Sequence, residues 1–120
     1  MLLFKKKFLE AIRAGTKTQT IRIWPVCRMK TGQRSYIPGA GYIQLDALEI
    51  LTLDQLTEDD AARDGFNSLA ELMAEINRLY PHGELAGHKV YRIRFHLLPP
   101  HEQEEVARAQ KERKQAKKGT

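Results

Sequence analysis

Ten residues near the N-terminus combine side chains that could bind or transform a polar ligand. The stretch GTKTQTIRIW spans residues 15–24. In an extended chain successive side chains point to opposite faces, so Thr20, Arg22 and Trp24 share one face and two isoleucines occupy the other. A hydroxyl, a guanidinium and an indole on one face, with Lys17 just before them, predict a pocket for a phosphate-bearing or base-like ligand.

Thr20 and Lys17 could together perform acyl-transfer chemistry. A threonine hydroxyl is a weak nucleophile at neutral pH and needs a base within hydrogen-bond reach. Lys17 could be that base if burial or a neighbouring cation such as Arg22 keeps it neutral. The structural alternative is that Thr20 is an ordinary strand residue and Lys17 a solvated turn residue, and the residue types leave both interpretations open.

Glu71 is a candidate carboxylate that also has a local explanation. Residues 68–71 read Ser-Leu-Ala-Glu, which fits the capping box in which the glutamate accepts a hydrogen bond from the amide of the serine. A carboxylate at a helix start can also hold a lysine, so the two roles are compatible.

Three arginines and a tryptophan have two interpretations each. Arg22 could bind a phosphate through its planar fork, or it could pair with an acidic residue between positions 57 and 64. Trp24 could stack on a base, worth roughly 1–3 kcal/mol, or it could close one end of a barrel. Arg92 and Arg94 share one face of a later strand and are interpreted as a solvated or phosphate-facing surface.

Periodicity and turn residues predict the elements that position these side chains. The predicted helices cover residues 6–14, 57–65 and 68–80, and the predicted strands cover residues 20–24, 33–37, 42–51 and 89–98. The alternation in the third strand changes phase, which predicts a β-bulge. We therefore expect an α+β fold, a small mixed barrel of about five or six strands with flanking helices. Ile21 and Ile23 should point inward, and Thr20 and Arg22 should line a cleft beside the helix that carries Glu71.

Composition narrows the class of protein. The chain has 120 residues, enough for one compact domain. Its one cysteine, Cys27, cannot form an intramolecular disulfide, which favours a reducing, cytoplasmic compartment. No segment approaches the roughly 18 apolar residues of a membrane span. The four histidines lack the close paired spacing of metal ligands, and no glycine-rich phosphate loop is present, so we expect no metal and no cofactor.

The charge is unevenly distributed along the chain. Residues 1–34 carry a net charge of +8 and residues 35–80 a net charge of −7, within a total of +5. A concentrated positive surface suits a polyanion or a phosphate, although a solvated surface without a partner is the alternative. Residues 101–120 are charged and almost free of apolar side chains. We therefore predict one domain over residues 1–100, followed by a charged helical tail over residues 101–120.

In order and spacing, these features resemble the ASCH domain family, whose fold is a PUA-like β-barrel. The resemblance covers about residues 1–96. The residues that carry it are Gly15, Lys17, Thr18, Thr20 and Arg22, then Gly65 and Phe66 after an acidic helix, and Glu71 in the helix that follows.

The resemblance implies a cleft that holds RNA or a nucleoside- or nucleotide-like ligand. Some members are bacterial amidohydrolases that remove the acetyl group from N4-acetylcytidine, and others are described as RNA-binding or RNA-cleaving modules. The amidohydrolases use a lysine, a threonine three residues later and a distant glutamate, and the matching positions here are Lys17, Thr20 and Glu71. After Arg22 this chain departs from the amidohydrolase pattern, with Ile-Trp-Pro and a basic loop.

We therefore expect an RNA- or nucleotide-binding domain, with a ligand cleft lined by Lys17, Thr20, Arg22 and Glu71 and extended by Thr18 and Trp24. The alternative is an amidohydrolase acting on N4-acetylcytidine or a related N-acyl pyrimidine. In that enzyme Thr20 would be the nucleophile, Lys17 the base and Glu71 the group that positions Lys17. A metal-independent ribonuclease is a third interpretation.

Overall fold

Local sequence signals set the bounds of most elements in the computed structural model, which describes residues 2–81 and 87–118. The helices are α1 (Lys6–Ala14), α2 (Glu58–Arg63), α3 (Leu69–Leu79) and α4 (Pro100–Lys118), with a short 3-10 helix at Leu53–Gln55. The strands are β1 (Gln19–Trp24), β2 (Arg34–Ile37), β3 (Gly41–Leu51) and β4 (Lys89–Leu97). Each predicted helix and strand is present, because caps and hydrophobic periodicity act over a few residues.

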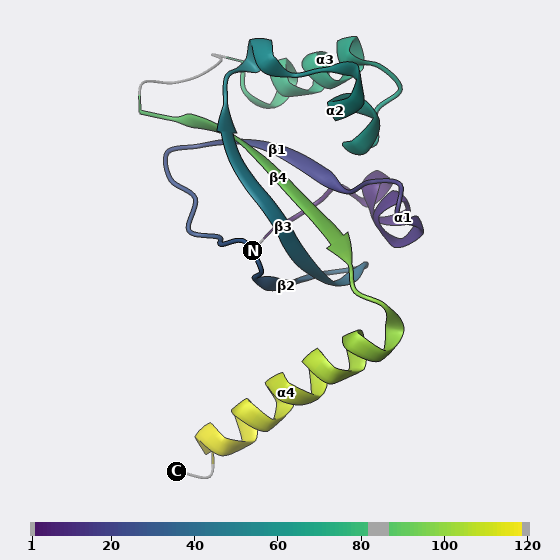
Figure 1. The fold of residues 1–120 in the computed structure, drawn as a ribbon, viewed down its shortest axis with the longest axis vertical. Coiled ribbons are helices and arrows are strands. Elements are labelled where there is room, and N and C mark those ends of the chain that lie inside the picture. Colours follow the sequence, from purple (N-terminus) through teal and green to yellow (C-terminus); the bar gives the residue numbers. More distant parts are fainter. Residues whose placement is uncertain (1, 82–86, 119–120) are drawn as a thin grey trace.

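The four strands form one antiparallel sheet in the order β1-β4-β3-β2. The sheet is curled into a half-barrel (Figure 1). The register of β3 against β4 shifts between Leu45 and Ala47, so the predicted bulge is confirmed and falls at Asp46. The expectation of five or six strands is wrong for the described residues, in which four strands and the flanking helices enclose the core.

The sheet has an apolar cluster on each of its faces. On one face Ile93 and Phe95 of β4 pack with Leu2 of the N-terminal segment and Ile12 of α1. On the other face Ile21 and Ile23 of β1 pack with Leu72 and Ile76 of α3. The two isoleucines of β1 are therefore buried as predicted, and the layer that covers them is formed by α2 and α3. Thr20, Arg22 and Trp24 consequently face the N-terminal segment and α1.

Helix α4 is anchored at its first turns and then projects away from the sheet (Figure 1). The Gln103 side chain accepts a hydrogen bond from the amide of Tyr42 at 2.8 Å and donates one to the carbonyl of the same residue at 2.8 Å. Val106 is buried, whereas residues 107–116 are exposed. The first two turns of α4 are thus held against the sheet. Contacts of the domain that we predicted over residues 1–100 therefore continue past residue 100.

Candidate functional site

The turn between α1 and β1 directs Lys17 into the interior. Helix α1 ends at Gly15, which adopts φ 81°, a left-handed conformation that glycine reaches without steric cost. The amide of Thr18 then donates to the carbonyl of Arg63 at 2.9 Å, and the Thr18 carbonyl accepts from the amide of Phe95 at 2.9 Å. These backbone bonds fix the path of the chain on both sides, so that Lys17 is only 3% exposed.

Lys17 forms a buried ion pair with Asp64, which follows the last residue of α2. Its Nζ atom lies 2.6 Å from Oδ1 of Asp64 and also donates to the carbonyl of the same residue. The rings of Phe8 and Phe4 flank the ammonium group, with centroids at 4.6 Å and 5.6 Å. Asp64 is 4% exposed, and its Oδ2 atom has no hydrogen-bond partner among the described residues.

Burial dominates the titration of this pair. It lowers the pKa of Lys17, an effect that the negative charge and hydrogen bond of Asp64 oppose and the charge of Arg22 reinforces. Burial also raises the pKa of Asp64, against the attraction of Lys17 and Arg22. Both shifts reduce the free-energy cost of neutralising the pair, which is the condition under which a lysine can accept a proton near neutral pH.

Thr20 and Arg22 are adjacent on the same face of β1 and contact each other directly. Nε of Arg22 donates to the Thr20 hydroxyl oxygen at 3.0 Å, and its Nη2 donates to the Leu3 carbonyl at 2.7 Å. Burial lowers the pKa of Arg22, but a guanidinium keeps its charge at any physiological pH. A hydroxyl oxygen that accepts from a guanidinium is better able to carry negative charge.

These side chains line a cavity of about 190 Å³. Its apolar walls include Phe4, Phe8, Phe66 and Leu72. The residues with polar groups that line it are Lys5, Lys17, Thr20, Arg22, Asp64, Glu75 and Tyr80. At the rim, Leu3 and Leu79 are 62% and 50% exposed. An ion pair of 2.8 Å between Lys5 and Glu75 joins the N-terminal segment to α3 beside this rim. The cavity therefore offers aromatic faces and a small set of charged and hydroxyl groups to a ligand.

The structure does not bring Glu71 to this cavity. Glu71 is exposed, its Oε2 atom accepts from the Asn67 amide at 2.8 Å, and its own amide donates to the Ser68 hydroxyl at 3.2 Å. It lines a separate shallow groove, and Phe8 and Phe66 also line this groove. Among the described residues no hydrogen bond or ion pair joins Glu71 to Lys17, and the predicted bond to the Ser68 amide is replaced by the bond to Asn67.

Asp64 is the carboxylate that the sequence reasoning missed. A signal for it exists, because an aspartate directly after the last residue of a helix is repelled by the negative end of the helix dipole. A cation beside such a position is favourable, and Lys17 lies there.

The other predicted ligand-binding residues lie outside the cavity. Trp24 is half-buried and packs against Tyr91, with ring centroids 6.2 Å apart, beside the apolar cluster of its face. Thr18 borders a different groove, between α1 and the start of α4. The predicted pairing of a strand arginine with the 57–64 helix does occur, but the arginine is Arg92, which contacts Asp60 at 3.1 Å.

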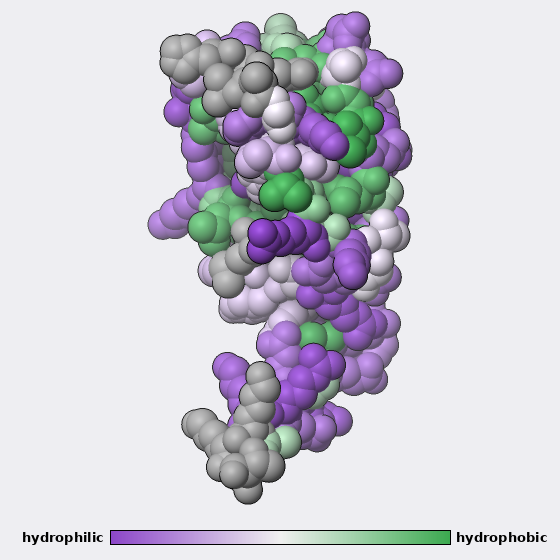
Figure 2. All heavy atoms as spheres, turned by 90° about the vertical axis from the view of Figure 1, so that its left-hand side faces the viewer, coloured by the Kyte–Doolittle hydropathy of each residue, from purple (hydrophilic) through white to green (hydrophobic). Residues whose placement is uncertain are grey.

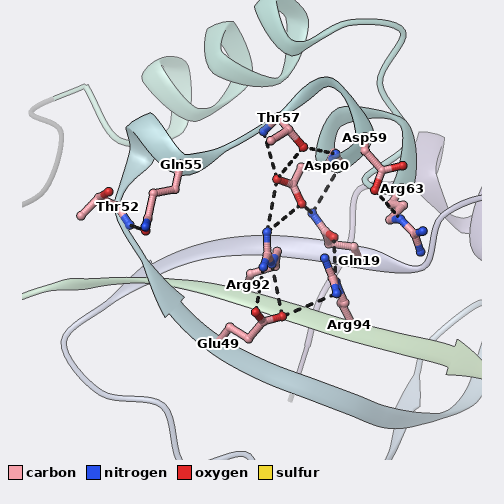
Figure 3. A network of polar contacts seen from close by, with 10 residues as sticks. All are labelled: Gln19, Glu49, Thr52, Gln55, Thr57, Asp59, Asp60, Arg63, Arg92 and Arg94. Carbon is pink, nitrogen blue, oxygen red and sulfur yellow. Dashed lines mark hydrogen bonds and ion pairs between the residues drawn. The ribbon is translucent and has the colours of Figure 1, made fainter.

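A polar network holds α2 against the sheet and thereby positions Asp64 (Figure 3). Asp60 is 1% exposed and accepts from the Thr57 amide at 3.0 Å, from Gln19 at 3.1 Å and from Arg92 at 3.1 Å. These bonds outweigh burial and keep the pKa of Asp60 below its usual value, although burial is the largest single effect and acts in the opposite direction. Gln19 follows Lys17 by two residues. The chain that enters β1 therefore contacts α2 at Asp60, through Gln19, and contacts Asp64 just after the helix, through Lys17.

Among the described residues, no group of three or more histidine, cysteine or acidic side chains could hold a metal ion. None of the described helices has both the length and the apolar character needed to cross a lipid bilayer.

The arrangement of strands and helices is an ASCH-like α+β fold, as the sequence predicted. It is similar to an ASCH domain from Lactobacillus crispatus JV V101, with a TM-score of 0.63 and 15% identity over 73% of this chain and 68% of that one. It is also similar to the hypothetical protein PH0355, with a TM-score of 0.66 and 15% identity over 80% and 95% of the two chains. Protein EF3133 from Enterococcus faecalis V583 has a TM-score of 0.57 and 18% identity over 77% and 70%.

No family model matches the sequence, and no curated protein matches it. The likeness to the solved structures is thus a likeness of fold.

Proposed function

We propose that the cavity binds a small planar ligand of the nucleobase or nucleoside class. The observation that carries the proposal is the buried Lys17, held between aromatic rings and an aspartate in a cavity that Thr20 and Arg22 also line. Aromatic faces favour a flat ring, and the polar groups can bond to its edge. Cavities for drug-sized ligands span roughly 300–1,000 Å³. A volume of about 190 Å³ suits one ring with a small substituent, so the ribose of a nucleoside would lie at the exposed rim beside Leu3 and Leu79.

The contacts of the N-terminal cations argue against polymeric RNA as the occupant of this cavity. Lys17 is paired with Asp64, Lys5 with Glu75, and Arg22 donates to a backbone carbonyl. Arg13 likewise donates to the carbonyl of Gly39. Several cations of residues 1–34 are therefore already paired with acids or carbonyl groups of the protein. A phosphate backbone would find few unpaired cations at the cavity.

A second candidate function is hydrolysis of an N-acyl group on such a ligand. Two observations favour it: burial lowers the pKa of Lys17, and Arg22 bonds to the Thr20 oxygen. The Thr20 oxygen would attack the acyl carbon while neutral Lys17 takes its proton. Lys17 would then return that proton to the leaving nitrogen as the carbon–nitrogen bond breaks. Water, deprotonated by Lys17, would then attack the acyl carbon and release the free acid, and Lys17 would return the proton to the Thr20 oxygen as its bond to that carbon breaks. In this scheme Asp64, rather than Glu71, positions Lys17.

Titration calorimetry with cytidine and with N4-acetylcytidine tests binding, and mass spectrometry of the same mixtures tests turnover. We expect binding of at least one of the two ligands. Thr20→Ala should abolish any turnover, whereas Thr16→Ala, an exposed threonine at the end of α1, should preserve both binding and turnover. If neither nucleoside binds to the wild-type protein, the proposed function is wrong. If a nucleoside binds without turnover, only hydrolysis is excluded.

A further inference from the structure

A second surface of the molecule lies on the exposed face of β2 and β3, away from the cavity. Tyr36 and Tyr42 are opposite one another in the strand register, and their ring centroids are 5.1 Å apart. Tyr36 is 48% exposed. Arg34 precedes it by two residues and is therefore on the same face, where it lies opposite Gln44. The neighbouring residues Ile37 and Ile43 point to the other face and are fully buried.

Helix α4 begins beside this tyrosine pair. The Tyr42 hydroxyl donates to Oε1 of Gln110 at 3.1 Å, in addition to the bonds between Gln103 and the Tyr42 backbone. Gln103, Val106 and Gln110 thus form the helix stripe that faces the sheet. The same helical spacing places the side chains at 113 and 114 on this side one turn later.

The exposed part of α4 is cationic. Between residues 107 and 116 every described side chain is exposed, and the charged residues are Arg108, Lys111, Arg113 and Lys114 against the single acid Glu112. The other acids of the helix, Glu102, Glu104 and Glu105, lie in its first two turns. Figure 2 shows mainly hydrophilic side chains along α4. The helix therefore lacks the apolar stripe that a partner helix or a lipid surface would require.

We propose that the tyrosine–α4 surface, defined by Arg34, Tyr36 and Tyr42 of the sheet and by Arg113 and Lys114 of α4, binds single-stranded nucleic acid. Exposed aromatic rings stack on unpaired bases, and nearby cations neutralise the phosphates that connect those bases. A duplex keeps its bases stacked within the helix, so Tyr36 could not reach a base face there. The inference does not depend on the cavity, because the two sites share no residue.

The test is fluorescence anisotropy of the full chain with a fluorescein-labelled 12-nucleotide RNA, single-stranded or annealed to its complement, at several salt concentrations. We expect the single strand to bind more tightly than the duplex, with an affinity that falls as salt rises. Tyr36→Ala should weaken binding of the single strand at least fivefold, since stacking on one ring contributes at least that factor. Tyr36→Phe keeps the ring and should stay within twofold of the wild type.

The helix is tested by the double variant Arg113→Gln/Lys114→Gln. It should flatten the dependence of log affinity on log salt by about 1.4, because each phosphate contact on a single strand contributes about 0.7. The matched control, Lys6→Gln/Lys89→Gln, removes two exposed charges elsewhere and should leave that slope nearly unchanged.

Absence of binding at low salt would overturn the inference, as would equal affinity for duplex and single strand. A fall in affinity that is the same for the two double variants, with no effect of Tyr36→Ala, would also overturn it, since it would show nonspecific attraction of a polyanion only.

Discussion

Removal of the Asp64 carboxylate is the sharpest test of the structure. In Asp64→Asn the side chain keeps its size, but Lys17 loses its anionic partner while it remains 3% exposed. Removing one member of a buried ion pair typically costs about 3–5 kcal/mol. Lys17 can limit this cost by losing its proton. From an unfolded-state pKa of about 10.4, that loss costs about 4.6 kcal/mol at pH 7, which falls within the same range.

The sign of the pH dependence follows from the same reasoning. In the variant, the folded-state pKa of Lys17 lies further below its unfolded value than in the wild type, because burial lowers it and Asp64 no longer opposes that effect. Between these two pKa values the unfolded state binds one more proton than the folded state, so stability of the variant should rise there by about 1.4 kcal/mol per pH unit. The destabilisation relative to wild type should therefore be smaller at pH 9 than at pH 7.

Urea unfolding at the two pH values measures both effects. Asp59→Asn is the matched control, because Asp59 lies on the same helix but its side chain is 68% exposed, and it should change stability by less than about 1 kcal/mol. Asp64→Asn/Lys17→Met should recover most of the lost stability, since two neutral groups replace the pair. Wild-type stability of Asp64→Asn, or a double variant less stable than the single one, would refute the buried ion pair.

Three further predictions concern separate parts of the chain. Glu71→Ala should cost about 1 kcal/mol of unfolding free energy, because Glu71 loses its bond to Asn67, and it should keep turnover per folded molecule. Lost turnover at unchanged stability would instead favour the role predicted from sequence, in which Glu71 positions Lys17. Truncation after residue 110 should leave the urea midpoint unchanged, whereas truncation after residue 99 removes Gln103 and Val106 and should lower it. If the protein hydrolyses an N-acyl pyrimidine, kcat/KM should rise with pH through the lowered pKa of Lys17 and then level off, and a rate that falls over that range would contradict Lys17 as the base.

Several features of the site were predictable because they depend on neighbouring residues alone. The alternation from Thr20 to Trp24 determined which side chains share a face of β1. The pattern of acids and the N-cap at Thr57 predicted α2, and the reciprocal bonds between Thr57 and Asp60 confirm its start. The phase change in β3 predicted the bulge that the register shows at Asp46.

The partners of the charged residues were decided by tertiary structure. Lys17 and Asp64 are 47 residues apart in sequence. Asp60, Asp64 and Glu71 are all acids near helix ends, and local rules do not say which of them packs against Lys17. Only the packing of α2 on the sheet, fixed by Gln19 and Arg92, selects Asp64 as the partner of Lys17 and leaves Glu71 in solvent. Periodicity follows from the geometry of the chain over a few residues, whereas an ion pair depends on how two distant elements pack. Burial of the two groups then shifts the pKa of each, against the attraction between them.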